Sequence, residues 1–150
     1  MNTTATMPPL MFKAALVSVE TCRAMLGQSE DVIVALVENG KLRFAFNLSV
    51  NSRSRRLLRI LSLSLLDHAA RTDTQPPTVD GAVRYIIPGS SPELHASWLA
   101  RHLNVSPTHI YNMLDGGCIQ DVSPRSRKAT GERTVSRASV VEFLKTRRCS

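Results

Sequence analysis

The sequence predicts a mainly helical α+β protein made of two tandem copies of one small unit. Short segments with apolar residues three and four positions apart, begun by Ser or Pro and ended by Gly, indicate amphipathic helices. Two parts of the chain also agree with each other in order and in chemistry, which indicates an internal repeat.

The repeat appears when residues 17–42 are placed above residues 94–119, an offset of 77 without a gap. Identical pairs are Leu26 with Leu103, Ser29 with Ser106, Ile33 with Ile110 and Gly40 with Gly117. A second match at an offset of 75 places residues 60–68 above residues 135–143, with a shared core at residues 64–67 (SLLD) and 139–142 (SVVE). The alternative is two helical hairpins whose similarity reflects only generic patterning.

The first unit is predicted to cover residues 14–70. A helix over about 18–26 is followed by a tight turn at Gly27 and by a second helix over about 30–39, which ends at a glycine. A β-hairpin follows, with strands over residues 42–50 and 56–61 and the basic tip NSRSR, and a helix over about 62–70 closes the unit. Its expected core consists of Cys22, Leu26, Ile33, Val37, Leu65 and Leu66.

Residues 71–92 (RTDTQPPTVDGAVRYIIPGSSP) are predicted to be a linker because they are rich in Pro, Gly, Ser and Thr. Within them, residues 82–87 are expected to allow a short strand at the edge of one hairpin.

The second unit is predicted to cover residues 93–148, with helices over about 95–103, 107–115 and 137–147. Its hairpin strands are expected over residues 119–122 and 133–135, joined by the basic tip SPRSRKATGE. Its expected core consists of Leu99, Leu103, Ile110, Leu114, Val140, Val141, Phe143 and Leu144.

The second helix of this unit lies in the stretch NVSPTHIYNMLDGG, residues 104–117. Ser106 stands where an N-cap belongs and Pro107 at the first helical position. One face is apolar, whereas the opposite face carries Thr108, Tyr111 and Asn112, which form hydrogen bonds and have no charge. Such a face is suited to reading the edges of DNA bases.

The charge is unevenly distributed. Nineteen Lys and Arg against twelve Asp and Glu give a net charge of +7. Residues 41–59 hold six basic side chains and no acid, and residues 123–150 hold eight basic side chains against two acids. This pattern favours a polyanionic partner, nucleic acid before membrane, and the alternative is a pair of solvated faces.

The order of helix, tight turn, helix ending in Gly, basic hairpin and closing helix resembles the MerR-like winged helix-turn-helix of excisionases and related small DNA-binding proteins. The residues that carry the resemblance are 18–20 (SVE), 26–27 (LG) and 40–42 (GKL) in the first unit and 103–106 (LNVS), 110–111 (IY), Gly117 and 134–144 in the second. The resemblance covers about two thirds of the chain. It implies two tandem winged helix-turn-helix units, each with a small β-hairpin wing. It also implies that the second helix enters the major groove while the wing lies along the phosphates or the minor groove.

The C-terminal unit is expected to do most of the base reading, because the second helix of the first unit carries the carboxylates Glu30, Asp31 and Glu38. Base contacts are predicted for Thr108, His109, Tyr111 and Asn112, with Asn112 bidentate to adenine. Contacts to the DNA backbone are predicted for Ser106, Arg53, Arg55, Arg56, Arg125, Arg127, Lys128 and Arg133.

Other classes of site are not expected. His95, His102 and His109 recur every seven residues, but the turn after the first helix separates them, so neither zinc nor any other cofactor is predicted. The sequence has no P-loop, no catalytic carboxylate pair and no nucleophile with an obvious base, so no enzymatic activity is expected. Three cysteines without CxxC spacing, no signal peptide and no membrane span favour a reducing cytoplasm. The resemblance implies that this is the cytoplasm of a bacterium or a phage-infected cell, in association with the nucleoid.

The sequence therefore predicts a sequence-specific double-stranded DNA-binding protein of a mobile element. It would act as an excisionase-type recombination directionality factor or as a transcriptional regulator, with an integrase or other recombinase as a further partner and as a homodimer or cooperative multimer on DNA. The alternative is an adaptor or phage-type packaging subunit that uses the N-terminal unit for protein contact. An RNA-binding role is weaker, because the sequence shows no aromatic stacking platform.

Overall fold

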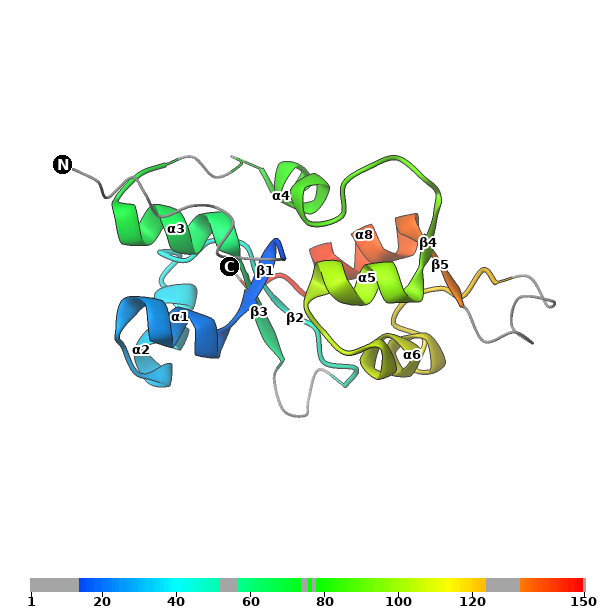
Figure 1. Ribbon diagram of the computed structural model, residues 1–150, viewed down its shortest axis with the longest axis horizontal. Coiled ribbons are helices and arrows are strands. Elements are labelled where there is room, and N and C mark those ends of the chain that lie inside the picture. The colour runs from blue at the N-terminus through cyan, green and yellow to red at the C-terminus, as the bar shows by residue number, and fades with distance from the viewer. Residues whose placement is uncertain (1–13, 52–56, 74–75, 77, 124–132, 150) are drawn as a thin grey trace.

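The computed structural model describes residues 14–51, 57–73, 76, 78–123 and 133–149. The first half contains β1 (Leu16–Ser18), α1 (Val19–Leu26), α2 (Glu30–Glu38), β2 (Ala45–Asn47), β3 (Leu58–Leu61) and α3 (Ser62–Ala70). The second half contains β4 (Glu93–His95), α5 (Ala96–Leu103), α6 (Pro107–Asp115), β5 (Thr134–Ser136) and α8 (Arg137–Thr146). The helix α4 (Val79–Ile86) joins them, and the two halves lie side by side in Figure 1. The predicted class, α+β and mainly helical, is confirmed.

The helices begin and end where the local sequence satisfies their free backbone groups. The Ser29 and Ser106 side chains accept hydrogen bonds from the first turns of α2 and α6, from Val32 N and His109 N. Gly27 after α1 and Asn104 after α5 both adopt the left-handed conformation, with φ of 63° and 57°. The two residues are equivalent at the offset of 77, and Asn tolerates this conformation better than most side chains.

The two halves also share their strand register. In the first half, β3 pairs antiparallel with both β1 and β2, and Val17 lies opposite Ile60. In the second half β4 pairs with β5, and Leu94 lies opposite Val135, which is the equivalent pair at offsets of 77 and 75. The first predicted hairpin is confirmed, with strands shorter than expected. The second is reduced to a single bridge between Asp121 and Val135.

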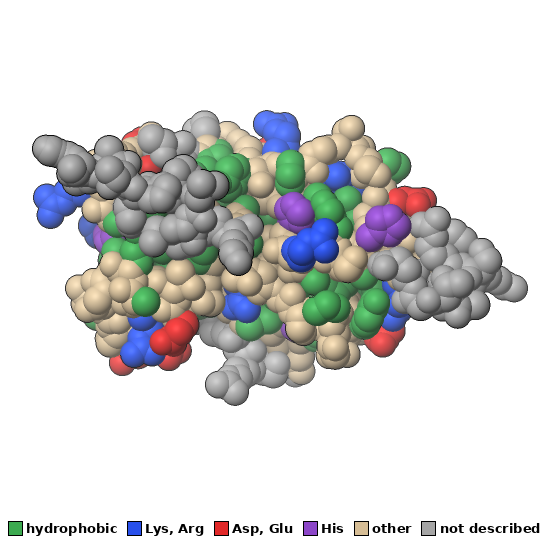
Figure 2. Space-filling view, in the orientation of Figure 1, with side chains coloured by type: hydrophobic (Ala, Val, Ile, Leu, Met, Phe, Trp, Pro, Cys, Tyr) green, Lys and Arg blue, Asp and Glu red, His purple; other side chains and the backbone are tan. Residues whose placement is uncertain are grey.

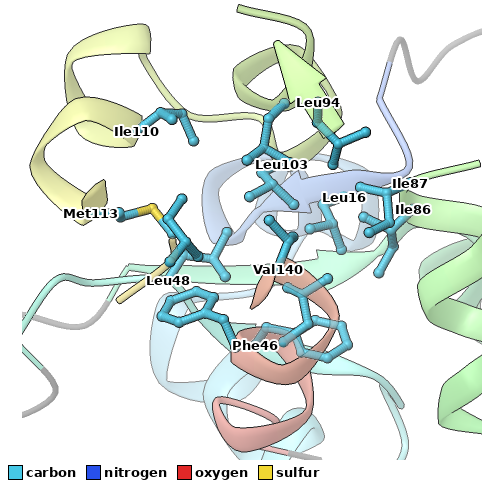
Figure 3. Packing of buried hydrophobic residues seen from close by; sticks show 14 of the residues in the cluster. Leu16, Phe46, Leu48, Ile86, Ile87, Leu94, Leu103, Ile110, Met113 and Val140 are labelled. Atoms are coloured by element: carbon cyan, nitrogen blue, oxygen red, sulfur yellow. The ribbon is translucent and has the colours of Figure 1, made fainter. Parts of the chain in front are cut away.

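One hydrophobic core lies within the first half, and a larger one extends across both. The core of the first half includes Cys22, Ile33, Val37 and Leu65, as predicted, and Leu26 packs at its edge, whereas Leu66 is not part of it. All eight core residues predicted for the second half belong to, or pack against, the larger core. That core also takes in Leu16, Phe44, Phe46, Leu48 and Leu61 of the first half. Figure 3 shows Phe46 and Leu48 beside Met113 and Val140.

The short strand predicted at residues 82–87 is wrong, because these residues belong to α4 and the turn after it. The Thr78 side chain caps the helix by accepting a hydrogen bond from Gly81 N. Ala82, Val83, Ile86 and Ile87 are buried in the larger core, and the burial of this face outweighs the presence of Gly81 and the β-branched residues.

The chain after α8 attaches the second half to the sheet of the first. Asn47 N donates to Arg147 O (2.9 Å) and Cys149 N donates to Ala45 O (2.7 Å), so the tail covers the edge of β2. The Arg147 guanidinium donates to the carbonyl oxygens of Asn47, Ser49 and Val50 at 3.2, 2.6 and 3.3 Å. The halves are therefore joined by backbone pairing and by a shared core. Within the described ranges, no helix has the length and apolar character needed to cross a bilayer.

Candidate nucleic-acid interface

The helix α6 separates buried apolar residues from exposed polar ones as predicted. Ile110 and Met113 are fully buried and Leu114 is nearly so, while Thr108 and Asn112 are exposed and Tyr111 is half-buried. Ser106, predicted to contact the DNA backbone, is exposed and caps the N-terminus of the helix. The helix therefore exposes the Thr108 hydroxyl and the Asn112 amide to solvent, while its buried apolar face packs against the core.

A segment of the first half holds α6 in place. His109 Nε2 lies 2.6 Å from the carbonyl oxygen of Leu48, and Cys118 Sγ lies 3.5 Å from that of Val50. A Cβ atom on Gly116 would come within 2.9 Å of Val50 Cγ1, so a larger residue would force Val50 or the backbone of Gly116 to shift. The predicted base contact by His109 is therefore not supported, because its ring turns toward the first half. A carbonyl oxygen only accepts, so Nε2 carries the hydrogen.

Arg133, a predicted backbone contact, lies at the base of the second hairpin and is already engaged. Its Nε and Nη2 lie 3.0 and 2.8 Å from Asp121 Oδ2, and its Nη1 lies 3.1 Å from Asp115 Oδ1. Its guanidinium also lies over the Tyr111 ring, 5.6 Å from the centroid. Burial of the Asp121 carboxyl works against ionisation, but hydrogen bonds from Ser123 and the pairing with Arg133 prevail and bring its pKa to about 2. Arg133 therefore ties the end of α6 to the hairpin.

Two other arginines of the basic zones connect segments of the fold. Arg59 Nε donates to Asn104 O in the turn between α5 and α6 (2.8 Å), and burial lowers the pKa of its guanidinium. Arg137 donates to the carbonyl oxygens of Ile87, Pro88 and Ser91 in the turn after α4. Carbonyl oxygens carry no net charge, so these contacts do not neutralise either guanidinium. The sequence shows the charge of these arginines but gives no sign of their partners, which lie 45 to 50 residues away.

The remaining predicted contacts lie outside the described residues: Arg53, Arg55 and Arg56 in the first hairpin tip, and Arg125, Arg127 and Lys128 in the second. The residues that flank the first tip are described. Val50 contacts α6, and Leu57 lines a surface groove with Glu30 and Val34 of α2. The base of the first hairpin thus lies between the second helices of the two halves.

The second helix of the first half has a different surface from α6. Glu30, Asp31 and Glu38 are exposed, and Val32 is 38% exposed. Figure 2 shows acidic side chains over α1 and α2 at the lower left of the molecule. Carboxylates are repelled by phosphates, so α2 is the poorer candidate for a DNA-reading helix.

The three histidines that recur every seven residues lie in different surroundings. His95 is exposed, His102 stacks on Trp98 with ring centroids 3.8 Å apart, and His109 contacts Leu48. Among the described residues, no group of three or more His, Cys, Asp or Glu is arranged to hold a metal ion.

Comparison with known protein families, with curated proteins and with solved structures gave no match.

Proposed function

We propose that the protein binds double-stranded DNA sequence-specifically and without enzymatic activity, as two tandem winged helix-turn-helix units. The observation that carries the proposal is the surface of α6, which exposes Thr108 and Asn112 while its opposite face is fully buried. A helix of this kind fits the major groove, where an Asn side chain can pair with adenine N6 and N7 at once.

The shared element order and strand register of the two halves support the tandem arrangement. The net charge of +7 favours a polyanion as the partner, and so do Arg59 and Arg137, whose guanidinium groups donate to uncharged carbonyl oxygens. Because a common core and the Arg147 contacts join the halves, we expect both to bind one duplex as a single body.

We propose that the protein serves a mobile element in the bacterial cytoplasm, as an excisionase-type recombination directionality factor or as a transcriptional regulator. DNA bending separates the two roles. A directionality factor that works with an integrase distorts its site strongly, whereas a simple repressor need not. Gel mobility of duplexes with the site placed at the centre or at the end measures this bend.

The second candidate is an adaptor or packaging subunit in which the first half binds a protein. The exposed carboxylates of α2 and the exposed Val32 favour this role. Charge reversal at Glu30 and Asp31 abolishes partner binding in this case and leaves DNA binding unaffected.

The test of DNA recognition is the binding of purified protein to duplexes selected from a random pool. Asn112→Ala is expected to relax base preference at one position, because a bidentate contact discriminates by about 1–3 kcal/mol. Ser97→Ala, on the exposed surface of α5, is the control and is expected to leave every preference unchanged. If the selected sequence is the same for Asn112→Ala as for the wild type, α6 is not the reading helix.

Joint replacement of Arg125, Arg127 and Lys128 by Ala tests the predicted backbone contacts. It is expected to weaken binding to all sequences alike and to flatten the dependence on salt by about 0.9 for each phosphate that the variant no longer neutralises. An unchanged salt dependence contradicts these contacts.

A further inference from the structure

The exposed stripe of α6 contains a fourth side chain, Asp115, in addition to the three polar residues expected to face DNA. Thr108, Tyr111, Asn112 and Asp115 stand at positions i, i+3, i+4 and i+7, which lie on one face of a helix. The Asp115 side chain is 68% exposed. Asp115 therefore lies on the same face of α6 as Asn112, three residues further along the helix.

One oxygen of the Asp115 carboxylate is bound by an arginine. Arg133 Nη1 binds its Oδ1 at 3.1 Å, and the other side of the same guanidinium binds Asp121 Oδ2 at 3.0 and 2.8 Å. The Tyr111 ring lies under the guanidinium and limits its movement. The second oxygen of Asp115, Oδ2, has no hydrogen-bond partner among the described residues. Asp115 thus keeps an acceptor oxygen that Arg133 does not use.

Resting on the proposed function, we propose that Asp115 is a base-reading residue that accepts a hydrogen bond from cytosine N4 in the major groove, and that Arg133 is its positioning residue. Cytosine is the base whose major-groove edge presents a donor and no acceptor. Guanine presents acceptors at O6 and N7, thymine presents O4, and adenine sets N7 beside its amine. All three place an acceptor against the carboxylate.

The location of this contact follows from helix geometry. Asp115 follows Asn112 by three residues, which is about 4.5 Å along the axis at 1.5 Å per residue. Base pairs are spaced by about 3.4 Å, so the cytosine is expected roughly one step from the adenine read by Asn112.

Asp115 also rejects the wrong bases. An ionised carboxylate offers only acceptors, so the exposed Asp115 side chain brings negative charge to a base edge on this face. With cytosine, the N4 amine donates a hydrogen bond to the carboxylate. With any other base, an acceptor lies against the carboxylate, and this repulsion weakens the binding of that duplex. The carboxylate therefore lowers the affinity for duplexes with another base at this position, and leaves the affinity for the cytosine duplex unreduced.

The test compares wild type, Asp115→Ala, Asp115→Asn and Arg133→Lys on the selected duplex and on its single-base variants. The matched control is Asp80→Asn on α4, which also removes one negative charge, from an exposed ion pair with Lys145 of α8. Thermal melting establishes that each variant is folded.

Wild type is expected to prefer cytosine at one position by about fivefold or more, since a good base contact discriminates by about 1–3 kcal/mol. Asp115→Ala is expected to remove this preference by strengthening binding to the other three duplexes. Asp115→Asn is expected to shift it toward adenine, and Arg133→Lys, which keeps the charge, to weaken it at that position alone. Asp80→Asn is expected to change all affinities by one factor.

If the Asp115 variants change all affinities by the same factor, as the control does, the carboxylate acts only through its charge and the inference is overturned. The inference is also overturned if the wild type selects a sequence without a cytosine at this position, or if Asp115→Ala keeps the cytosine preference. In both cases the proposed function stands. A wild type that binds no duplex overturns both.

Discussion

Replacement of Arg147 by Ala tests whether the two halves form one cooperative body. The change removes three hydrogen bonds to the carbonyl oxygens of Asn47, Ser49 and Val50. It also removes the stacking of the guanidinium over the Phe143 ring, 4.7 Å from its centroid. These carbonyls belong to the segment that contacts α6, so the change weakens the junction of the halves.

The size of the effect follows from these contacts. Hydrogen bonds to a charged group contribute roughly 1.5–3 kcal/mol each. Arg147 is half-buried, so water can bind to some of the carbonyl oxygens that lose their donor. The contributions of neighbouring contacts are also not additive. We expect the free energy of unfolding to fall by about 2–4 kcal/mol. Arg147→Lys is expected to fall between wild type and Arg147→Ala, because a single ammonium cannot span the three acceptors.

Urea unfolding followed by two probes measures both stability and cooperativity. Trp98 is the single tryptophan of the chain and reports on the second half, whereas far-ultraviolet circular dichroism reports on both halves. The two transitions of the wild type are expected to coincide. Arg101→Ala, at an exposed position on α5, is the control and is expected to change stability by less than about 0.5 kcal/mol. A decrease below about 1 kcal/mol for Arg147→Ala, or separate transitions in the wild type, refutes a joined pair of halves.

Two further predictions concern the packing of α4 and the ion pair between Asp121 and Arg133. Ile86→Ala is expected to lower the free energy of unfolding by about 2–4 kcal/mol, because Ile86 is fully buried in the larger core; urea midpoints measure it, and a decrease typical of an exposed site would show that α4 does not pack there. Asp121 has a pKa of about 2 in the folded protein, below its ordinary 3.8, so its stabilising effect is present above about pH 4 and disappears as the pH falls toward 2. Asp121→Asn is therefore expected to be less stable than wild type at pH 6 and to show a shallower decline between pH 4 and 2. Parallel stability curves for the two proteins across that interval would contradict the pairing with Arg133.

The helices could be predicted from local sequence because their signals are local. Ser29 and Ser106 mark helix starts, and Gly27 and Asn104 mark ends in the left-handed conformation, so α1, α2, α5 and α6 lie within a residue or two of the expected bounds. The strands β1 and β4 were missed because three residues are too few to show an alternating pattern. The segment containing α4 was misjudged because its Pro and Gly content hid apolar residues at helical spacing.

The polar face of α6 was predictable, but its surroundings were not. Thr108 and Asn112 are exposed as their spacing predicts. By contrast, the contact of His109 with Leu48 joins residues 61 positions apart, and Arg147 reaches carbonyl groups almost 100 positions away. No local pattern encodes such contacts. Asp115 lies four residues after Tyr111, so its place on the same face follows from the spacing alone.

The central claim is that α6 reads DNA from a rigid, positively charged body. Binding of the wild-type chain to a random duplex pool, measured over a series of salt concentrations, tests it most directly. We expect one sequence to be enriched and the logarithm of the binding constant to fall linearly with the logarithm of salt concentration, by about 0.9 per phosphate contacted. Absence of binding at low salt, or binding without any enriched sequence, would contradict the claim.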